Sequence, residues 1–343
     1  TPLYSSAASD VYKRQLIVLA YVPDTIWTRT YGGINNDYGY SVCETSDGGF
    51  IIAGHTASFG AGGYDFYLIK TDADGDTLWT KTYGGSNDDY GYSVQETSDQ
   101  GYIITGHTYS FGSGGSDIYL IKTDTAGNTQ WTKTYGGNGD EESFSVQQTK
   151  DGGYIIVGST TSFGAGSRDV YLIKTDSVGD TLWTETYGEF NDDNGRAVQG
   201  TLDGGYIITG ETYSSGSGNG DLYVIKTDSL GDTLWTGVFG WADNDKGNCV
   251  RLTADRGYIM AGASYWPGLG YEMLYVKIDS NGNYIWHYYN GGLSNDYAYA
   301  VQDASDGGYI IVGNFSYDVY LIKTDTAGNS QWGEMYGGPN TEC

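Results

Sequence analysis

The chain has few cysteines and few basic residues, and each shortage excludes a class of protein. Only 3 of its 343 residues are Cys, so no disulfide framework holds it together, and no Cys/His spacing indicates a zinc site. Lys and Arg number 17 against 43 Asp and Glu, which gives a formal net charge of −26. Such a surface repels phosphate backbones and anionic headgroups. We therefore expect no nucleic-acid partner.

Long apolar runs are also lacking. No stretch reaches the roughly 18 apolar residues of a membrane-spanning helix, so we expect no membrane insertion. The 55 glycines follow no three-residue period, which excludes collagen. Aromatic residues make up 15% of the chain, far too many for a disordered protein. The composition therefore indicates a folded, acidic protein.

What the chain has instead is an internal repeat. Between successive tryptophans the same sequence pattern recurs. It consists of Tyr-Gly-Gly, an acidic residue, Ser-Val, Asp-Gly-Gly-Tyr-Ile-Ile, a Ser/Gly-rich loop and Tyr-Leu-Ile-Lys-Thr-Asp. A period of this length is typical of blades stacked in a β-propeller. The spacings are 52, 52, 52, 52, 51 and 46 residues for Trp27, Trp79, Trp131, Trp183, Trp235, Trp286 and Trp332.

Each interval contains four short β-like runs bounded by turns. In the first interval we expect strands at Tyr40–Thr45, Phe50–Thr56, Asp65–Asp72 and Thr77–Tyr83, because these runs are rich in Tyr, Ile, Val and Thr. Asp-Gly-Gly and Asp-x-x-Gly sequences between them supply tight turns. No segment has helical spacing. The sequence therefore predicts an all-β propeller of six complete four-stranded blades plus one extra outer strand.

The repeat resembles two known families. It is similar to the bacterial and archaeal seven-bladed β-propeller repeat of secreted proteins over about residues 24–340. The turn from Asp72 through Gly75 to Trp79 resembles the tryptophan-docking motif of quinoprotein-type propellers, which have one more residue between Asp and Gly. The resemblance implies an architecture and an extracellular or cell-surface location, and it carries over no catalytic residue. The first similarity rests on Tyr31, Gly32, Gly33, Asp37, Val42, Asp47, Gly48, Gly49, Phe50, Ile51, Ile52 and Gly54.

The ends of the chain depart from the repeat. Residues 1–22 match no blade, and we interpret them as an assembly scar followed by a signal-peptide remnant. Residues 23–343 are predicted to form a single β-propeller domain that is incomplete at its C-terminus. Ile26–Tyr31 is predicted to be the fourth, outer strand of a blade whose first three strands are missing from the sequence. We infer a seven-bladed parent from which one blade of about 40 residues is missing; the alternative is six closed blades with a spare first strand.

One acidic position recurs in all six intervals, ten residues after each tryptophan. Carboxylates are ligands for calcium, so a ring of hard-cation sites is one interpretation, and calcium is the one cofactor that we keep open. The other interpretation is that each carboxylate accepts backbone N–H groups and ties one blade to the next. We favour the structural role, because a binding site seldom recurs in every blade. These positions are Asp37, Asp89, Glu141, Asp193, Asp245 and Asp296.

Six lysines also recur at one position of the repeat, on the third predicted strand. They account for much of the scarce positive charge. We expect each to pair locally with a surplus carboxylate, and such surface pairs contribute little to stability. The positions are Lys70, Lys122, Lys174, Lys226, Lys277 and Lys323.

The fifth interval carries the two tryptophans outside the repeat frame. Trp241 stands in the linker that enters the blade, and Trp266 stands in the loop between its second and third strands. Both kinds of connection lie on one face of a propeller, so the two indoles should project near each other. With neighbouring Tyr265, Tyr271 and Asp243 they form a candidate ligand site, since exposed aromatics beside carboxylates are typical of sugar-binding and protein-docking patches. The alternative is that both indoles fold back and cover the core of the blade.

The chain has three histidines, and two of them, His55 and His107, share one repeat position. We find no set of nucleophile, base and orienting group around them, so we expect no enzymatic activity. The sequence favours a secreted, non-catalytic recognition scaffold whose partner is a protein or a glycan. The alternative is a structural subunit that forms a homo-oligomer or polymer as an extracellular layer, tube or fibre.

Overall fold

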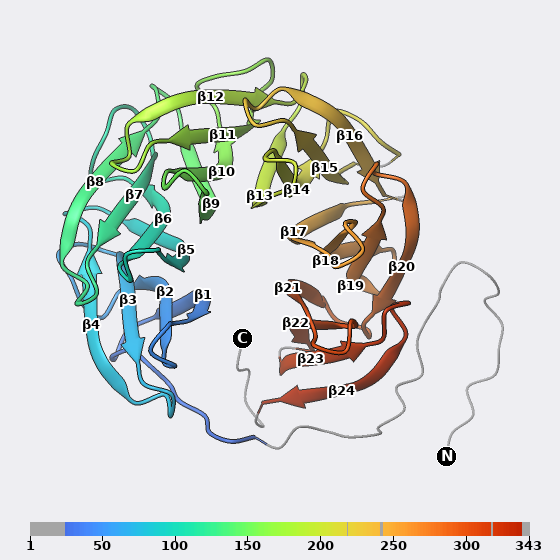
Figure 1. The fold of residues 1–343 in the computed structure, drawn as a ribbon, viewed down its shortest axis with the longest axis horizontal. Coiled ribbons are helices and arrows are strands. Elements are labelled where there is room, and N and C mark those ends of the chain that lie inside the picture. Colours follow the sequence, from blue (N-terminus) through green and yellow to red (C-terminus); the bar gives the residue numbers. More distant parts are fainter. Residues whose placement is uncertain (1–24, 218, 241–242, 317, 338–343) are drawn as a thin grey trace. The chain divides into compact units, whose positions relative to one another are not determined.

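The computed structural model describes residues 25–217, 219–240, 243–316 and 318–337. These residues form strands β1 to β24 and contain no helix, and therefore no helix able to cross a bilayer. The strands build six antiparallel four-stranded sheets, in each of which the strands follow chain order (Figure 1). We call the sheets blades 1 to 6. The predicted all-β fold of six four-stranded blades is confirmed.

The first three blades repeat the same strand lengths almost without change. Blade 1 consists of β1 (Asp37–Glu44), β2 (Phe50–Thr56), β3 (Asp65–Thr71) and β4 (Thr77–Tyr83). Blade 2 consists of β5 (Asp89–Glu96), β6 (Tyr102–Thr108), β7 (Asp117–Thr123) and β8 (Thr129–Tyr135). Blade 3 consists of β9 (Glu141–Gln148), β10 (Tyr154–Thr160), β11 (Asp169–Thr175) and β12 (Thr181–Tyr187).

The remaining blades keep this plan, with two longer strands in blade 5. Blade 4 consists of β13 (Asp193–Gly200), β14 (Tyr206–Thr212), β15 (Asp221–Thr227) and β16 (Thr233–Phe239). Blade 5 consists of β17 (Asp245–Leu252), β18 (Tyr258–Trp266), β19 (Gly270–Ile278) and β20 (Tyr284–Asn290). Blade 6 consists of β21 (Tyr297–Asp303), β22 (Tyr309–Phe315), β23 (Asp318–Thr324) and β24 (Ser330–Tyr336).

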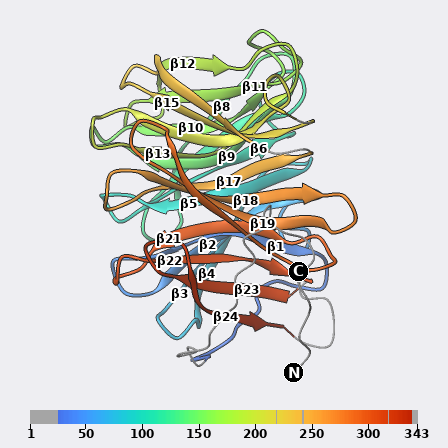
Figure 2. The same ribbon diagram turned by 90° about the vertical axis from the view of Figure 1, so that its right-hand side faces the viewer.

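The chain divides into two compact units. The larger unit, within the described residues, comprises 25–214 and 226–234, and it holds blades 1 to 3 with β13 and β14. The smaller unit, within the described residues, comprises 215–217, 219–225, 235–240, 243–316 and 318–337, and it holds blades 5 and 6. In the larger unit the first strands β1, β5, β9 and β13 contact one another in turn. In the smaller unit blades 5 and 6 are stacked, with β21 against β17, β18 and β19 (Figure 2).

Burial within a blade follows the order of its strands. The second and third strands of blade 2, β6 and β7, are buried along their whole length, whereas the fourth strand β8 alternates between exposed and half-buried positions. The middle strands have sheet neighbours on both sides and blades against both faces, which explains their unbroken apolar sequences. The first and fourth strands therefore supply the side chains that reach solvent.

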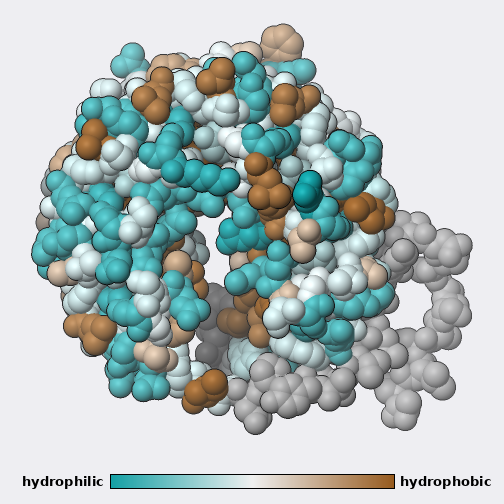
Figure 3. Space-filling view, in the orientation of Figure 1, coloured by the Kyte–Doolittle hydropathy of each residue, from teal (hydrophilic) through white to brown (hydrophobic). Residues whose placement is uncertain are grey.

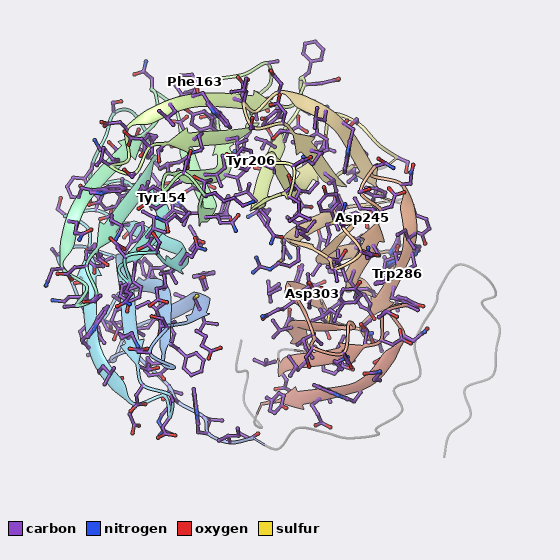
Figure 4. All side chains as sticks on the ribbon, in the orientation of Figure 1. Tyr154, Phe163, Tyr206, Asp245, Trp286 and Asp303 are labelled. Carbon is purple, nitrogen blue, oxygen red and sulfur yellow. The ribbon has the colours of Figure 1, made fainter. Side chains whose placement is uncertain are left out.

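The repeated tryptophan in the fourth strands of blades 1 to 5 packs onto the following blade. The indole of Trp131 meets Tyr154 at a ring-centroid distance of 5.8 Å, and the next pair, Trp183 and Tyr206, at 6.0 Å; both tyrosines begin the second strand of their blade (Figure 4). In the smaller unit Trp286 meets Tyr309 at 6.0 Å in the same way. The frame tryptophans are half-buried, because the fourth strand lies at the edge of its sheet.

A glycine in the turn of the following blade makes this contact possible. A Cβ on Gly179 would stand 2.8 Å from the Trp131 indole, and the φ of Gly179 is +80°, a conformation that residues with a side chain rarely adopt. Beside the indole, the Tyr135 hydroxyl donates a hydrogen bond of 2.7 Å to the Gly179 carbonyl. The Asp-x-x-Gly turn is therefore a docking surface for the preceding blade as well as a connection.

The segment before blade 1 makes the same contacts. The Trp27 indole donates to the carbonyl of Ala73 at 3.2 Å, and the Tyr31 hydroxyl donates to the carbonyl of Gly75 at 2.8 Å. Residues 25–33 nevertheless have no assigned strand. Their side chains are thus placed as those of a fourth strand, consistent with the predicted extra outer strand. The predicted leader, residues 1–22, lies outside the described residues.

The repeated lysines pair as predicted, but they are far more buried than surface pairs. Lys122 is 3% exposed; its ammonium lies 3.0 Å from the Asp99 carboxylate and donates to the Thr123 carbonyl at 2.9 Å. Asp99 belongs to the turn between the first and second strands, so the lysine of the third strand fastens that turn. Because a buried ammonium is costly without a partner, the expectation of weak surface pairs was wrong. Sequence spacing did not reveal that the lysine points inward.

We predict that Trp131→Ala lowers the free energy of unfolding by about 3 kcal/mol, because it removes a large side chain from the contact between blades 2 and 3. Denaturant unfolding followed by circular dichroism measures the change. Gln130→Ala, the neighbouring residue of the same strand and exposed, is the control and should change the value by less than about 0.5 kcal/mol. An unchanged stability in Trp131→Ala would mean that the tryptophan does not hold the blades together.

Candidate functional site

The predicted aromatic residues of blade 5 lie on a hairpin that is longer than its counterparts. Strands β18 and β19 pair as far as Tyr265 with Tyr271 and Trp266 with Gly270, where a loop was expected. The rings of Tyr265 and Tyr271 meet edge to face at 5.3 Å. Two of the predicted site residues therefore touch each other, and the replacement of the usual Ser/Gly loop by Tyr and Trp explains the two extra strand residues at this end.

Trp266 does not stand free of the blade. Its half-buried indole meets Tyr289 edge to face at 5.4 Å, and Tyr289 belongs to the fourth strand of the same blade and is 3% exposed. Part of the indole thus covers the blade's own core, and part remains accessible. Asp243 is half-buried and precedes β17. Trp241 lies outside the described residues. The predicted proximity of the Trp241 and Trp266 indoles therefore stays a prediction.

Tyrosines of blade 6 extend this patch, and the sequence analysis missed them. Tyr297 meets Tyr271 at 5.0 Å and stacks on Tyr299 at 6.1 Å, and Tyr299 is 55% exposed. The Lys246 ammonium lies 5.1 Å from the ring of Tyr271 and 4.6 Å from that of Tyr297, as in a cation–π interaction. We call Tyr265, Tyr271, Tyr297 and Tyr299 the blade 5 tyrosine surface.

A second cluster of tyrosines lies in the larger unit, at the junction of blades 1 and 2. Its centre is His55 of β2, which is 4% exposed. Five tyrosine rings surround the imidazole with centroids 4.9 to 6.1 Å away. Two of them are about half exposed, Tyr38 at 45% and Tyr40 at 53%. We call these five the blade 1 tyrosine surface: Tyr38, Tyr40, Tyr64, Tyr90 and Tyr92.

An aromatic row continues from this surface along the first strands. Tyr40 of β1 meets Tyr92 of β5 at 5.0 Å, and Tyr92 meets Phe144 of β9 at 5.3 Å. The Arg196 guanidinium of β13 lies 4.6 Å from the Phe144 ring and pairs with Glu211 at 3.2 Å. Four successive blades therefore present one aromatic or cationic side chain each at the same repeat position.

A signal for both surfaces is present in the sequence. The first strand opens as Asp-Tyr-Gly-Tyr in blades 1 and 2 and as Asp-Tyr-Ala-Tyr in blade 6, but as Glu-Glu-Ser-Phe, Asp-Asn-Gly-Arg and Asp-Lys-Gly-Asn in blades 3 to 5. The frame around these two positions is constant while the positions themselves change. Positions that vary within a constant frame are those whose side chains are not needed for blade packing.

His55 and His107, which share one repeat position, are both buried among aromatic rings. Burial lowers the pKa of His55 to about 4 and also lowers the pKa of His107. His107 is 5% exposed and packs against Tyr90 at 5.0 Å and Tyr92 at 5.6 Å. Both imidazoles are therefore neutral at pH 7 and belong to the aromatic cluster.

The carboxylate at the recurring acidic position accepts hydrogen bonds from nearby backbone and hydroxyl groups. Asp89, which is fully buried, accepts the N–H of Gly85 at 2.7 Å and the hydroxyl of Ser110 at 2.8 Å, and the Thr108 hydroxyl also donates to it. Asp37, Glu141, Asp193 and Asp296 accept similar N–H and hydroxyl groups. Asp245 stands at the same place, at the start of the first strand β17. Among the described residues no three or more His, Cys, Asp or Glu side chains gather as a metal site.

A second carboxylate from the preceding blade lies beside Asp89, Glu141, Asp193 and Asp296, which the sequence analysis did not foresee. Asp65 of β3 and Asp89 both border Gly84 in the linker between blades 1 and 2. Burial raises the pKa of Asp65, and the charge of Asp89 raises it further. The pair thus joins the linker to both blades at an electrostatic cost that the surrounding N–H and hydroxyl donors offset.

A cavity of about 330 Å³ opens at the other end of the first strands, between Gln147 and Lys150 of blade 3 and Leu202 of blade 4. The charged groups at its edge, Asp151 and Lys174, already pair with each other at 2.9 Å. The described lining of this cavity therefore offers no nucleophile with an adjacent base.

No family model matches the chain. A curated relative, the regulatory protein FlaEY of Caulobacter vibrioides, is 26% identical over 181 residues, which is 45% of this chain and 19% of that protein. The matched part thus spans about a fifth of the relative's length.

Solved structures at low identity define the fold. The WD40 domain of Neurospora crassa Pan2 superposes with a TM-score of 0.55 at 11% identity over 88% of this chain and 80% of that one. The Dos1 propeller gives 0.53 at 11% over 89% and 71%, and BBS1N, solved in complex with ARL6DN, gives 0.52 at 13% over 92% and 88%. WD40 domains are β-propellers. The protein therefore has a β-propeller fold with six blades.

The buried histidines predict a loss of stability in mild acid. In the unfolded chain His55 titrates near pH 6.5, whereas its folded pKa is about 4, so the folded state resists protonation. The His55 contribution to the free energy of unfolding should be complete above about pH 7 and should fall by up to about 1.4 kcal/mol per pH unit as the pH drops from 6.5 towards 4. His107, whose pKa burial also lowers, acts in the same direction. Urea unfolding at a series of pH values measures this slope.

His55→Phe keeps an aromatic ring in the cluster and should reduce the slope without abolishing it, because His107 remains. Leu182→Ala, at an exposed position of an outer strand, is the control and should leave it unchanged. Identical pH profiles for the wild type and His55→Phe would show that the folded state does not resist protonation of His55.

Proposed function

We propose that the protein is a non-catalytic recognition module that binds a protein or a glycan through the blade 5 tyrosine surface together with Trp266. The observation that carries the proposal is the patch itself, in which Tyr271 and Tyr297 flank Lys246 and Tyr299 is more than half exposed. Rigid aromatic side chains with a polar tip are enriched in binding hot spots. Asp243 precedes this strand cluster and would add an acceptor to the site.

The fold supports such a role. A β-propeller presents the ends of its strands as a rigid scaffold, and one of the structural neighbours, BBS1N, was solved in complex with another protein, ARL6DN. The visible surface is largely hydrophilic with separate hydrophobic groups (Figure 3), which suits a ligand held by a few aromatic anchors within a polar surround. The net charge of −26 favours neutral or basic partners over anionic ones.

A catalytic role has less support. The described histidines lie among aromatic rings, and the recurring carboxylates accept hydrogen bonds from their own blades. Neither set is arranged as a nucleophile with a base, nor as an open metal site. We therefore propose that the protein is not an enzyme and needs no cofactor.

We further propose that the chain belongs with the secreted seven-bladed propellers that its repeat resembles, and that it acts outside the cell. The packing of Trp79 on Gly127 and of Trp131 on Gly179 supports a relationship between its turns and the tryptophan-docking turns of quinoprotein-type propellers. Fractionation of the native host cells tests the location: the protein should be found in the medium or on the cell surface, and recovery from the cytosol would contradict it.

A second candidate function is self-assembly. Apolar side chains recur at one exposed position of the fourth strands, in the range of 46 to 57% exposure. Repeated apolar groups at a sheet edge are suited to contact between copies. The position is held by Leu78, Leu182, Leu234 and Ile285. Sedimentation velocity decides between the candidates, since a recognition module stays monomeric over a range of concentrations at which a structural subunit forms larger species.

The recognition proposal predicts that truncating the patch removes binding without unfolding the protein. Once a ligand is found on glycan and protein arrays, Tyr271→Ala and Trp266→Ala should each weaken it by about tenfold or more, because buried aromatic anchors carry most of the energy of an interface. Quenching of tryptophan fluorescence, or calorimetry for the Trp266 variant, gives the affinity.

Tyr284→Ala is the control for these variants, because Tyr284 is 52% exposed on the outer strand β20 and lies apart from the described patch. Its affinity should equal that of the wild type. Full binding by both patch variants would remove the blade 5 surface as the binding site.

A further inference from the structure

The blade 1 tyrosine surface contains two buried polar atoms whose presence blade packing does not explain. The Nδ1 atoms of His55 and His107 are buried and have no hydrogen-bond partner, and the residues are 4% and 5% exposed. Leaving a buried polar atom without a hydrogen-bond partner lowers stability, and an apolar side chain would fill the space without that cost. A neutral imidazole below exposed tyrosines is suited to hydrogen-bond a ligand that reaches it.

The geometry of the cluster limits the kind of ligand. His55 itself fills the space between the five tyrosine rings, with all centroids within 6.1 Å. A cation such as a quaternary ammonium group therefore finds no empty aromatic cage. What remains open is the outer side of Tyr38 and Tyr40, which are 45% and 53% exposed. Such rings form a platform for stacking rather than a cage.

The charge around the cluster disfavours anionic ligands. The described rings that surround His55 are all tyrosines, and the nearby acid Asp88 accepts a hydrogen bond from the Tyr90 hydroxyl at 3.2 Å. Phosphate, sulfate or uronate groups would meet this carboxylate and the acidic surface of the chain. The cluster instead offers aromatic faces, phenolic hydroxyls and uncharged imidazoles, which match the C–H faces and hydroxyl groups of an uncharged sugar.

The extent of the aromatic row indicates a ligand longer than one sugar ring. From Tyr40 the row passes through Tyr92 to Phe144 with centroid spacings of 5.0 and 5.3 Å, and Arg196 ends it. The Arg196 charge is balanced by Glu211, so the far end of the row is also close to neutral. A chain of several sugar rings would contact the first strands of successive blades.

We propose that the blade 1 tyrosine surface is a second binding site, for a neutral oligosaccharide, in which Tyr38 and Tyr40 stack on a sugar ring and the imidazole of His55 hydrogen-bonds a sugar hydroxyl. This site is separate from the blade 5 tyrosine surface and extends the proposed recognition function, on which it rests in part. The rings of Tyr38 and Tyr40 are half exposed, so their rotamers can adjust to a ligand in ps–ns motions.

The test begins with the whole chain on an array of neutral oligosaccharides (glucans, mannans, galactans and N-acetylglucosamine oligomers) beside sialylated and sulfated ones. The strongest neutral oligosaccharide is then titrated by calorimetry. We expect binding by at least one neutral oligosaccharide, at least tenfold weaker binding in Tyr40→Ala, and several-fold weaker binding in His55→Phe, which keeps the ring but removes both nitrogens. Tyr38→Ser serves as a second variant if Tyr40→Ala does not fold, as judged by circular dichroism.

Two controls separate this site from the rest of the protein. Tyr284→Ala, on the outer strand β20, should bind the oligosaccharide as the wild type does. Trp266→Ala reports separately on the blade 5 surface. Binding that is lost in Trp266→Ala and kept in Tyr40→Ala overturns this inference while the proposed function stands. Binding of only acidic glycans, no neutral binding at millimolar concentration, or a protein partner that requires Tyr40 in place of a sugar also overturns it.

Discussion

The contact between a tryptophan and a glycine of the next blade is the constraint on which the rest of the structure depends. Trp131 lies where a Cβ on Gly179 would stand, and Tyr135 bonds the carbonyl of the same glycine. The frame residues Trp, Tyr and Gly are therefore fixed by packing between neighbouring blades. Because stability in a repeat protein comes largely from such nearest-neighbour interfaces, the frame recurs with little change, and change is tolerated elsewhere.

The positions that are free to change lie at the start of the first strands, and there the tyrosine surfaces are found. Tyr40 is held by its strand while its ring is half exposed, and the matching position in blades 3 and 4 holds Phe144 and Arg196. One scaffold can in this way carry different surfaces on different blades. The buried lysine–aspartate pairs and the satisfied carboxylates stabilise each blade beneath those surfaces.

Much of the fold could be predicted from the sequence, and less of the site. Strands Phe50–Thr56 and Thr77–Tyr83 have the predicted bounds, because turn residues and β-branched runs act locally. The burial of Lys122 was not predicted, since it depends on how the third strand faces the turn before the second. The blade 1 surface was missed because its tyrosines resemble frame residues, and His55 was considered as a catalytic group, not as the centre of a cluster. The role of Trp241 in the aromatic site stays a prediction.

The central claim is that the tyrosines divide into a structural set and a ligand-binding set, and selective isotope labelling of tyrosine rings tests it most directly. NMR spectra are recorded while an identified protein or oligosaccharide ligand is added. The account predicts shifts in the resonances of surface tyrosines such as Tyr40 or Tyr299, with those of Tyr154 and Tyr206 between the blades unchanged. Shifts confined to the structural tyrosines, with the surface ones unmoved, would contradict it.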